Sequence, residues 1–393
     1  MKKIIKLFNL ILKCKFKFKN PKQNNLILFD DVGEYVFENV LYTKNYSSLQ
    51  VRLENIETIY VSWNIFLNMI RNFNTNLLNC YLIALIKIID PKVILTSVDN
   101  SFKFSELAKI LYKNITFIAV QNASRYDFDR NQRLYKIGSL KQDNNKRFFI
   151  PHYYCFGDQE VEDCKKFNIE VLNFYKIGSL RLSQYLNYLK KNQIILNLKK
   201  FDISLISESS AGKDELWKQA GVENGFAKIV KFTIKFCLKN NLSFVFVKKR
   251  ENKDLSQAEM IWYQKFLDKN EFEFISKNST TVQKQDFISY KAIHQSKVSI
   301  GTCSTLLREK LALKGKILAC NFTPLDHYDF PIKGICFMKN PTFEDFEKRI
   351  FKILKINNDD YFSSINNKQL IKVNENNTQF NVLNKNIQNL LSQ

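Results

Sequence analysis

The 393-residue sequence has few of the residues that build metal centres and disulfide frameworks. Its eight cysteines include no CxxC pair, and none of its three histidines lies near a pair of cysteines. Structural zinc sites need closely spaced Cys and His ligands, so the sequence gives no support for one. Several cysteines lie inside apolar runs, and we expect them to be reduced, buried thiols in a cytoplasmic protein.

Other absences narrow the class of function. The sequence contains no zinc finger, RNP motif or dense arginine stripe, which argues against a nucleic-acid partner. The spacing GxxxxGK followed by Ser or Thr, which marks an ATP-binding loop, is also missing. The apolar stretch within residues 1–22 is too short to span a bilayer, and no small-residue cleavage site follows it.

Positive charge is abundant by contrast. The chain has 60 basic and 38 acidic residues, a formal net charge of +22, which favours anionic surroundings. Residues 1–22 contain eight lysines and no acidic residue, and Lys2, Lys6, Asn9 and Lys13 fall on one helical stripe. This pattern predicts a basic interfacial helix, peripheral on the inner face of the cytoplasmic membrane. The alternative is a segment that is disordered or forms a helix packed on the core.

Alternating apolar strands and helices predict an α/β protein large enough for two domains. In the first half, buried strands at 26–29, 93–98 and 115–120 each run into polar residues. In parallel sheets the carboxyl ends of the strands share one edge, where ligands bind. The polar residues expected at this edge are Asp30, Asp31, Glu34, Asp99, Asn100, Gln121, Asn122 and Arg125.

The most informative stretch is 297–322, KVSIGTCSTLLREKLALKGKILACNF, which predicts a strand, a turn, a helix and a second strand. Hydroxyls of Thr302, Ser304 and Thr305 would lie beside free amides at the helix N-terminus, a seat for phosphate. Glu309, one helical turn further on, would face the same mouth and suits a ribose diol. The alternative is a Ser/Thr N-cap with a surface glutamate.

This arrangement, with a Lys-Gly-Lys exit from the helix, resembles the donor-nucleotide half of GT-B glycosyltransferases. QNASR after a strand at 121–125 is similar to a segment of Kdo transferases and related surface-carbohydrate transferases that lines the acceptor side. VDN at 98–100 is similar to strand ends in bacterial surface-polysaccharide transferases. A strand that runs into Gly178-Ser179 resembles the last strand of a GT-B N-terminal domain.

The resemblance implies two Rossmann-like domains that face each other across a cleft. We expect a basic amphipathic segment at 1–22, an acceptor domain at 23–182, a linker helix at 183–199, a nucleotide-sugar domain at 200–340, and a C-terminal helix and polar tail at 341–393. The helix at 343–356 is expected to pack back on the first domain, with a loosely held tail beyond it.

The function implied by the resemblance is a metal-independent glycosyltransferase without a cofactor. The donor would be a nucleotide sugar, with a CMP-linked ulosonic acid such as Kdo as one candidate, and the acceptor a bacterial surface glycan or glycolipid. No DxD pair lies where a metal-dependent GT-A enzyme would need one. A nucleotide-sugar 2-epimerase of the same fold and a non-catalytic glycan- or lipid-binding scaffold remain as alternatives.

The local pattern and the resemblance together suggest catalytic, acceptor-binding and donor-binding roles for individual residues. Three cations, Lys248, Lys249 and Arg250, follow a predicted strand and suit a diphosphate or a sugar carboxylate, although a solvated charge run has the same appearance. The catalytic candidates, which the sequence does not rank, are Asp30, Asp31, Glu34, Asp99 and Glu208. The acceptor-binding candidates are Asn100, Gln121, Asn122 and Arg125. The donor-binding candidates are Gly178, Ser179, Ser207, Ser209, Lys248, Lys249, Arg250, Thr302, Ser304, Thr305 and Glu309.

Overall fold

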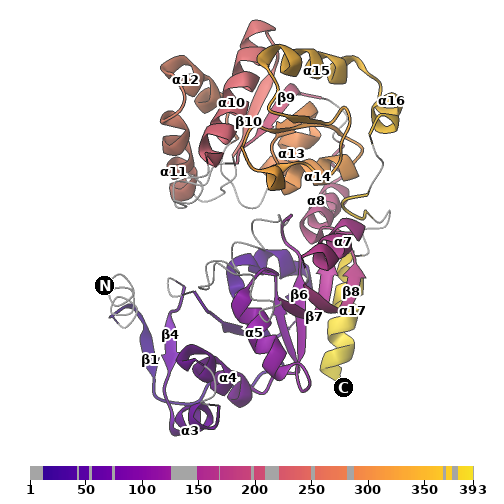
Figure 1. Cartoon of the computed structure of the whole chain (residues 1–393). Helices are drawn as coiled ribbons and strands as arrows, with labels where there is room; N and C mark the ends of the chain where they lie inside the picture. Colours follow the sequence, from indigo (N-terminus) through magenta and orange to yellow (C-terminus); the bar gives the residue numbers. More distant parts are fainter. Residues whose placement is uncertain are drawn as a thin grey trace. The chain divides into compact units, whose positions relative to one another are not determined.

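The computed structural model describes residues 12–41, 44–52, 55–72, 76–124, 148–167, 169–195, 199–208, 221–248, 253–280, 287–365, 369–373 and 379–392. The chain divides into two compact units (Figure 1). Unit 1 comprises Met1–Ser183 and Asn374–Gln393, and unit 2 comprises Gln184–Val373.

Unit 1 is built on a six-stranded parallel sheet. Its strands, in spatial order, are β3 (Ser47–Leu49), β2 (Leu26–Phe29), β5 (Val93–Thr96), β6 (Thr116–Val120), β7 (Phe149–Cys155) and β8 (Glu170–Lys176). Strand β2 is the first of this sheet in chain order and lies between β3 and β5. The chain therefore winds outward from it in both directions. This is the doubly wound arrangement expected from the sequence.

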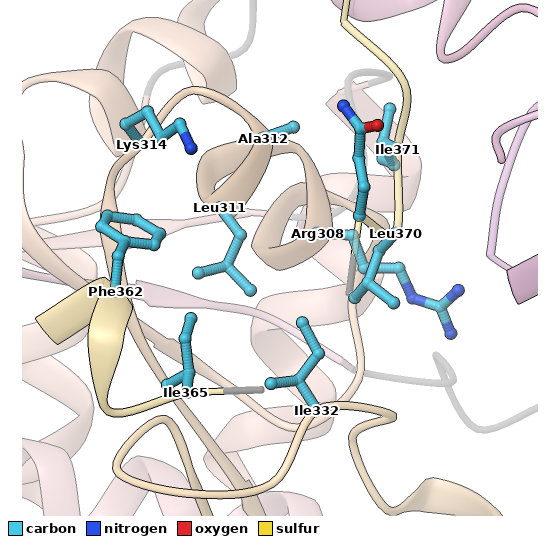
Figure 2. Close-up of a pocket in the computed structure, with 10 residues that line it drawn as sticks. Arg308, Leu311, Ala312, Lys314, Ile332, Phe362, Ile365, Leu370 and Ile371 are labelled. Carbon is cyan, nitrogen blue, oxygen red and sulfur yellow. The ribbon is translucent and has the colours of Figure 1, made fainter. Parts of the chain in front are cut away.

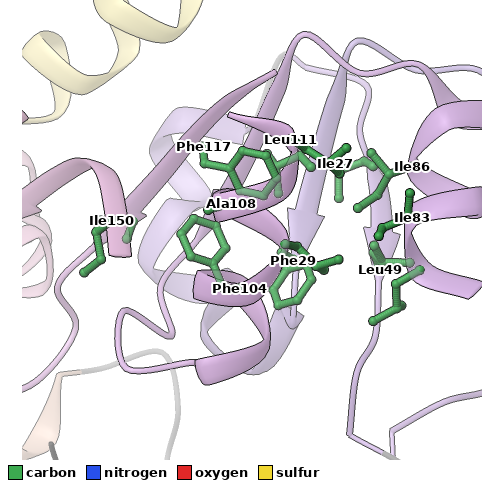
Figure 3. Close-up of a cluster of buried hydrophobic side chains, with 14 of the residues drawn as sticks. Ile27, Phe29, Leu49, Ile83, Ile86, Phe104, Ala108, Leu111, Phe117 and Ile150 are labelled. Atoms are coloured by element: carbon green, nitrogen blue, oxygen red, sulfur yellow. The ribbon is translucent and has the colours of Figure 1, made fainter. Parts of the chain in front are cut away.

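Helices cover both faces of this sheet. They are the 3₁₀ helix η1 (Asp31–Phe37), α2 (Glu38–Leu41), α3 (Trp63–Arg71), α4 (Leu77–Ile89), α5 (Phe102–Leu111), α7 (Asp158–Lys166), the start of α8 (Leu180–Lys191) and α17 (Gln379–Ser392). Each face has its own apolar core. One contains Phe29, Phe104 and Phe117 (Figure 3), and the other contains Leu28, Leu95 and Leu383.

A short two-stranded ribbon stands apart from the main sheet. Its strands are β1 (Lys15–Lys17) and β4 (Thr58–Tyr60), which pair in parallel. The ribbon is fixed to α4 because the Tyr81 hydroxyl lies 3.0 Å from both the backbone nitrogen and the carbonyl oxygen of Tyr60. The predicted basic helical segment therefore does not continue as a helix through residue 22, since residues 15–17 are extended.

Unit 2 repeats the doubly wound plan with five parallel strands. In spatial order these are β10 (Phe244–Val247), β9 (Phe201–Ile206), β11 (Ser296–Gly301), β12 (Lys316–Asn321) and β13 (Phe337–Lys339). The helices are α10 (Val222–Lys239), α11 (Lys253–Gln264), α12 (Lys269–Lys277), α13 (Ile288–His294), α14 (Thr305–Ala312), η2 (Asp326–Tyr328), α15 (Phe343–Lys355) and α16 (Asn358–Ser363). The predicted strand, turn, helix and strand of 297–322 are confirmed as β11, α14 and β12.

The C-terminal region differs from the expectation. Helix α15 packs on α10, β11 and β12 of unit 2, so the prediction that it packs on the first domain is wrong. Helix α17, yellow in Figure 1, instead lies against α2 and β5 of unit 1. Its residues Phe380, Leu383 and Ile387 recur at helical spacing and are buried in a core of unit 1. The Asn- and Gln-rich composition of the predicted tail hides this apolar stripe.

All eight cysteines are buried, as predicted. In the part of the chain that the structure describes, no helix is both long and apolar enough to cross a membrane.

Candidate functional site

The topological switch point of unit 2 brings two of the predicted segments together. The first strand, β9, lies between β10 and β11, so the connections that leave the ends of β9 and β11 run in opposite directions along the sheet. In open α/β sheets this divergence opens a crevice at the carboxyl ends of the strands, where ligands bind. Ser207 and Glu208 follow β9 here, and 302–304 follow β11.

Glu208 joins the two strand ends. Its Oε1 accepts a hydrogen bond from the Cys303 backbone N–H at 3.2 Å, and its own N–H donates to the Tyr263 hydroxyl at 3.2 Å. Both Glu208 and Cys303 are buried. The carboxylate is therefore held in one place at the start of the turn that leads into α14, which suits a group that must meet a ligand in a defined geometry.

Ser207 belongs to the interior of unit 2. Its hydroxyl is hydrogen-bonded to the Glu259 carboxylate and lies 2.9 Å from the Tyr263 hydroxyl. Burial raises the pKa of the Tyr263 phenol, so this ring stays neutral and serves as a hydrogen-bond partner. The predicted contact of Ser207 with the donor stays a prediction, and the structure gives Ser207 a role in fixing the end of β9.

The N-terminus of α14 presents two half-buried hydroxyls. Ser304 is the N-cap residue, yet its side chain makes no capping hydrogen bond, and Thr305 follows it. The first amides of a helix have no partner within the helix, so an uncapped N-terminus flanked by hydroxyls can receive a phosphate. The alternative interpretation of Ser304 as an ordinary N-cap predicts a capping bond, which the structure does not contain. Thr302, by contrast, is fully buried.

Glu309 does not lie at the open mouth of the site. Its side chain is 2% exposed, and its Oε1 accepts a hydrogen bond from the Tyr290 hydroxyl at 2.9 Å. The reason is that α13 packs against α14 and covers the face on which Glu309 lies. The expectation that Glu309 is accessible is therefore wrong for this conformation, and its role in ribose binding stays a prediction.

A group of basic residues that was not singled out from the sequence includes the buried Lys310, which follows Glu309, together with the half-buried His294 and the exposed Lys199. Lys310 donates from Nζ to the carbonyl oxygens of Ile293 and Ser296, at 2.5 and 2.7 Å, and burial lowers its pKa well below the usual range. Lys199 donates to the carbonyl of His294 at 2.6 Å. The Nδ1 of His294 lies 3.1 Å from the Tyr185 hydroxyl.

His294 should make the stability of unit 2 depend on pH. Burial, together with the charges of Lys199 and Lys310, lowers its pKa to about 4, against about 6.5 in an unfolded chain. The unfolded state therefore binds more protons between these values, and stability is lost as the pH falls from about 6.5 towards 4. In His294→Gln this loss should shrink by about 2–3 kcal/mol. Urea unfolding at neutral pH and near pH 4 measures the free energy of unfolding in each protein.

His152 provides the internal control for that comparison. Burial lowers its pKa too, but it is present in both proteins, so its contribution cancels in the difference. Equal acid sensitivity of the wild type and the variant would contradict the prediction.

A cavity of about 330 Å³ lies on another side of α14 (Figure 2). It contains none of the predicted site residues. Its lining is Arg308, Leu311, Ala312, Lys314, Ile332, Phe362, Ile365, Gln369, Leu370 and Ile371.

The carboxyl edge of the unit 1 sheet gathers several acceptor and catalytic candidates around the switch between β2 and β5. Asp30 is buried and is paired with Arg52, whose Nε lies 2.8 Å from Oδ2. A side chain on Gly33 would place its Cβ 1.9 Å from Ser97 Oγ and 3.4 Å from Asn122 Nδ2. Only glycine fits at 33 with these neighbours in place, because the backbone passes directly over the end of β5.

Other candidates in unit 1 have structural partners. Asp99 is buried and accepts a hydrogen bond from the Tyr153 hydroxyl at 2.9 Å. Gln121 accepts from the Phe156 N–H at 2.8 Å and donates to the Ala123 carbonyl at 3.1 Å, so it joins the ends of β6 and β7. Asn100 and Asn122 are half-buried, whereas Glu34 is exposed and accepts a hydrogen bond from Tyr46.

Gly178 and Ser179 form the turn between β8 and α8. Gly178 has a φ of +84°, a left-handed conformation that favours glycine. The Ser179 hydroxyl accepts from the Leu182 N–H at 3.1 Å and therefore caps α8. Their predicted approach to a donor stays a prediction.

Some predicted site residues lie outside the described residues. They are Arg125, Ser209, Lys249 and Arg250, together with the side chain of Asp31. Lys248 is described: it is half-buried after β10, and burial lowers its pKa. Within the described ranges, no three His, Cys, Asp or Glu side chains form a group that could hold a metal ion.

Comparison with known proteins gives matches among solved structures. No protein-family model and no curated protein matches the sequence. Among solved structures, the UDP-GlcNAc 2-epimerase of Methanocaldococcus jannaschii in complex with UDP-GlcNAc and UDP is 10% identical with a TM-score of 0.52, over 93% of this chain and 99% of that one. The UDP-N-acetylglucosamine 2-epimerase from Rickettsia bellii is 12% identical with a TM-score of 0.51, over 94% and 96%.

A variant of the wall teichoic acid polymerase TagF matches with 12% identity and a TM-score of 0.49, over 94% of this chain and 90% of that one. The two epimerase matches, at 10% and 12% identity, show the fold. Together with the two doubly wound sheets, they identify the chain as an α/β protein with two Rossmann-like domains, the GT-B architecture expected from its sequence.

Proposed function

We propose that the protein is a glycosyltransferase that binds a nucleotide sugar in unit 2. The observation that carries this proposal is the switch point between β9 and β11, where the buried carboxylate of Glu208 is fixed to the turn that opens α14. At the adjoining helix N-terminus the Ser304 side chain makes no capping hydrogen bond, and the hydroxyls of Ser304 and Thr305 are half-buried. Hydrogen-bond donors for a phosphate and a carboxylate thus meet at the ends of two neighbouring strands.

This arrangement suits departure of a nucleotide from a sugar. Charge builds on the phosphate as the glycosidic bond breaks, and helix amides and hydroxyls aimed at that position stabilise it without a metal or a cofactor. Glu208 contacts the turn directly, because its carboxylate accepts a hydrogen bond from the Cys303 N–H. A carboxylate is needed to activate the acceptor hydroxyl or to attack the sugar. We assign Glu208 as the first candidate for that role.

We infer a finer identity for the substrates from the charge of the chain. Lys248 lies at the end of β10, next to β9, and with Lys249 and Arg250 it provides cations for a diphosphate or for the carboxylate of a CMP-linked ulosonic acid such as Kdo. The basic N-terminal region favours an acceptor that is a surface glycan or glycolipid held at the inner face of the membrane.

A second candidate function is epimerisation of a free nucleotide sugar. The observation that favours it is that the two solved structures reported above with a TM-score greater than 0.5 are UDP-GlcNAc 2-epimerases, one of them holding UDP-GlcNAc and UDP. An assay with the nucleotide sugar alone separates the two functions, since epimerisation needs no acceptor. A non-catalytic scaffold would change no nucleotide sugar under either condition.

Thermal unfolding with CMP, UDP, GDP, ADP and CDP tests the nucleotide site. A nucleotide at about 100 times its dissociation constant should stabilise the protein by about 2.7 kcal/mol. Ser304→Ala/Thr305→Val should weaken binding by more than about 100-fold, because it removes two hydrogen bonds to a charged group, each of which contributes about 1.5–3 kcal/mol.

The matched control is Ser276→Ala on α12, which also removes a hydroxyl from unit 2 and should leave the nucleotide response unchanged. A response to CMP would favour the ulosonic-acid donor, and a response to UDP would favour a UDP-sugar. Stabilisation by no nucleotide would refute the proposal, and an unchanged response of the double variant would refute the assigned site.

A further inference from the structure

Helix α3 of unit 1 carries apolar side chains on two opposite faces. Ile65 is buried and Met69 packs against the core, which fixes the helix on the unit. Trp63, Phe66 and Ile70, at positions i, i+3 and i+7, are 70%, 50% and 53% exposed. A helix on the surface of a soluble domain normally presents polar residues on its outer face. This second apolar stripe is therefore open to a partner.

The β1 strand extends this stripe into a larger surface. The Lys17 carbonyl accepts from the Val61 N–H at 2.9 Å, and the Ser62 hydroxyl donates to Asn20 Oδ1 at 2.6 Å, so the chain after β1 runs beside the start of α3 (Figure 1). Phe18, in this segment, is 81% exposed. The rings of Trp63 and Phe66 lie 5.4 Å apart. We call the surface formed by Phe16, Phe18, Trp63, Phe66 and Ile70 the aromatic surface.

Along the chain, lysines alternate with Phe16 and Phe18 of the aromatic surface, and acidic residues are sparse. Residues 12–22 contain the exposed Lys13, Lys15, Lys17, Lys19 and Lys22 and no acidic residue. No acidic residue occurs between Glu57 and Asp90, a range that includes all of α3 and α4, whereas Arg71 and Lys87 are exposed there. The surface therefore combines exposed aromatic and aliphatic groups with one sign of charge.

We propose that the aromatic surface docks unit 1 onto an anionic lipid bilayer. Tryptophan and phenylalanine insert at the level of the headgroups, aliphatic chains reach the acyl boundary, and lysines attract acidic lipids. A second copy of the chain would bring lysines against lysines. A nucleic acid would meet the lysines but would leave Ile70 and the aliphatic part of the surface without partners. The bilayer satisfies both the apolar and the charged parts.

Sedimentation with vesicles tests the proposal without any nucleotide sugar, so its result is independent of the proposed enzymatic function. Wild-type protein should bind phosphatidylglycerol-containing vesicles and not pure phosphatidylcholine vesicles, and added salt should weaken binding. Trp63→Ser/Phe66→Ser/Ile70→Ser and Lys15→Gln/Lys17→Gln/Lys19→Gln should each weaken binding at least tenfold. All six side chains are exposed, so each variant should keep its fold. Thermal unfolding of each variant verifies this.

The chain offers a matched control for the apolar variant. Leu172→Ser/Leu238→Ser/Ile261→Ser removes three side chains that are 50%, 55% and 51% exposed elsewhere, and it should bind vesicles like the wild type. Lipids brominated in their acyl chains provide a direct readout. In a Trp217→Phe background they should quench the tryptophan fluorescence strongly, and much less once Trp63→Phe is added, since the remaining Trp262 is buried.

Several results would overturn the proposal. Equal binding to neutral vesicles, equal loss in the control variant, or unchanged quenching in Trp63→Phe would each exclude the aromatic surface as the lipid-binding site. A dimer that is abolished by the apolar triple variant, without vesicle binding, would instead assign the surface to a second copy. Tight binding of an RNA by the wild type, lost in the lysine variant and unmatched by vesicles, would assign it to nucleic acid.

Discussion

Replacement of Glu208 by glutamine should lower turnover of the nucleotide sugar by about 10²–10⁴-fold while nucleotide binding and the fold are retained. The amide oxygen of glutamine can still accept the hydrogen bond from the Cys303 N–H, which the carboxylate accepts at 3.2 Å. The backbone bond from residue 208 to the Tyr263 hydroxyl is not affected either. What the variant loses is the ability to take up a proton or to attack the sugar.

Glu309→Gln is the matched control for this prediction. It also replaces a buried glutamate of unit 2 and keeps an acceptor for the Tyr290 hydroxyl. If Glu309 binds the ribose, this variant should raise KM with little effect on kcat, the opposite of the pattern expected for Glu208→Gln. Steady-state kinetics of both variants separates the two roles.

A wild-type kcat in Glu208→Gln would show that the side chain acts only by positioning the turn. Asp30 and Asp99 would then be the next candidates. Both are buried at the carboxyl edge of the unit 1 sheet, where Arg52 and Tyr153 hold them. Ser304 and Thr305 would keep their assignment, because the thermal unfolding experiment tests them separately.

The sequence predicts the ends of the strands well because that information is local. An apolar run followed by polar residues marks both the strand and its carboxyl end, as at β5 with Asp99 and at β9 with Glu208. The hydroxyl turn before α14 is likewise visible as Thr302, Ser304 and Thr305 after a strand. The alternation of such strands with helices was sufficient to predict two doubly wound domains.

The contacts that give these residues their roles were not predictable in the same way. Tyr263 is 56 residues from Ser207 along the chain, and Arg52 is 22 residues from Asp30. Such pairs depend on how distant helices and strands pack, and no local pattern marks them. Glu309 shows the consequence, since its position on α14 was predicted correctly but its burial depends on α13.

The same distinction explains the C-terminus. Sparse apolar residues at 380, 383 and 387 are enough to bury α17 in unit 1, although its polar composition suggests a loose tail. Conversely, α3 shows more apolar residues than its packing needs. A composition-based interpretation underestimates α17, and only the structure shows that the outer stripe of α3 is exposed.

The largest loss of stability is expected for Phe104→Ala in unit 1. The Phe104 side chain is fully buried, and its ring meets Phe29 and Phe117 edge to face, with centroid distances of 5.7 and 5.4 Å (Figure 3). Truncation of a buried phenylalanine removes apolar contacts and leaves a cavity, which costs about 3–5 kcal/mol. Urea unfolding should show this loss, which is a large fraction of a domain stability of about 5–15 kcal/mol.

Phe66→Ala makes the same chemical change at an exposed position and should alter stability by less than about 0.5 kcal/mol. Hydrogen exchange resolved by peptide adds the decisive readout, because each unit has its own sheet and Phe104 lies in a core formed by unit 1 alone. Peptides from β2, β5 and β6 should lose protection in Phe104→Ala, whereas peptides from β9, β11 and β12 should keep it. Equal loss in both groups would show that the two units unfold as one, and Glu208 and the turn before α14 would then depend on the core of unit 1.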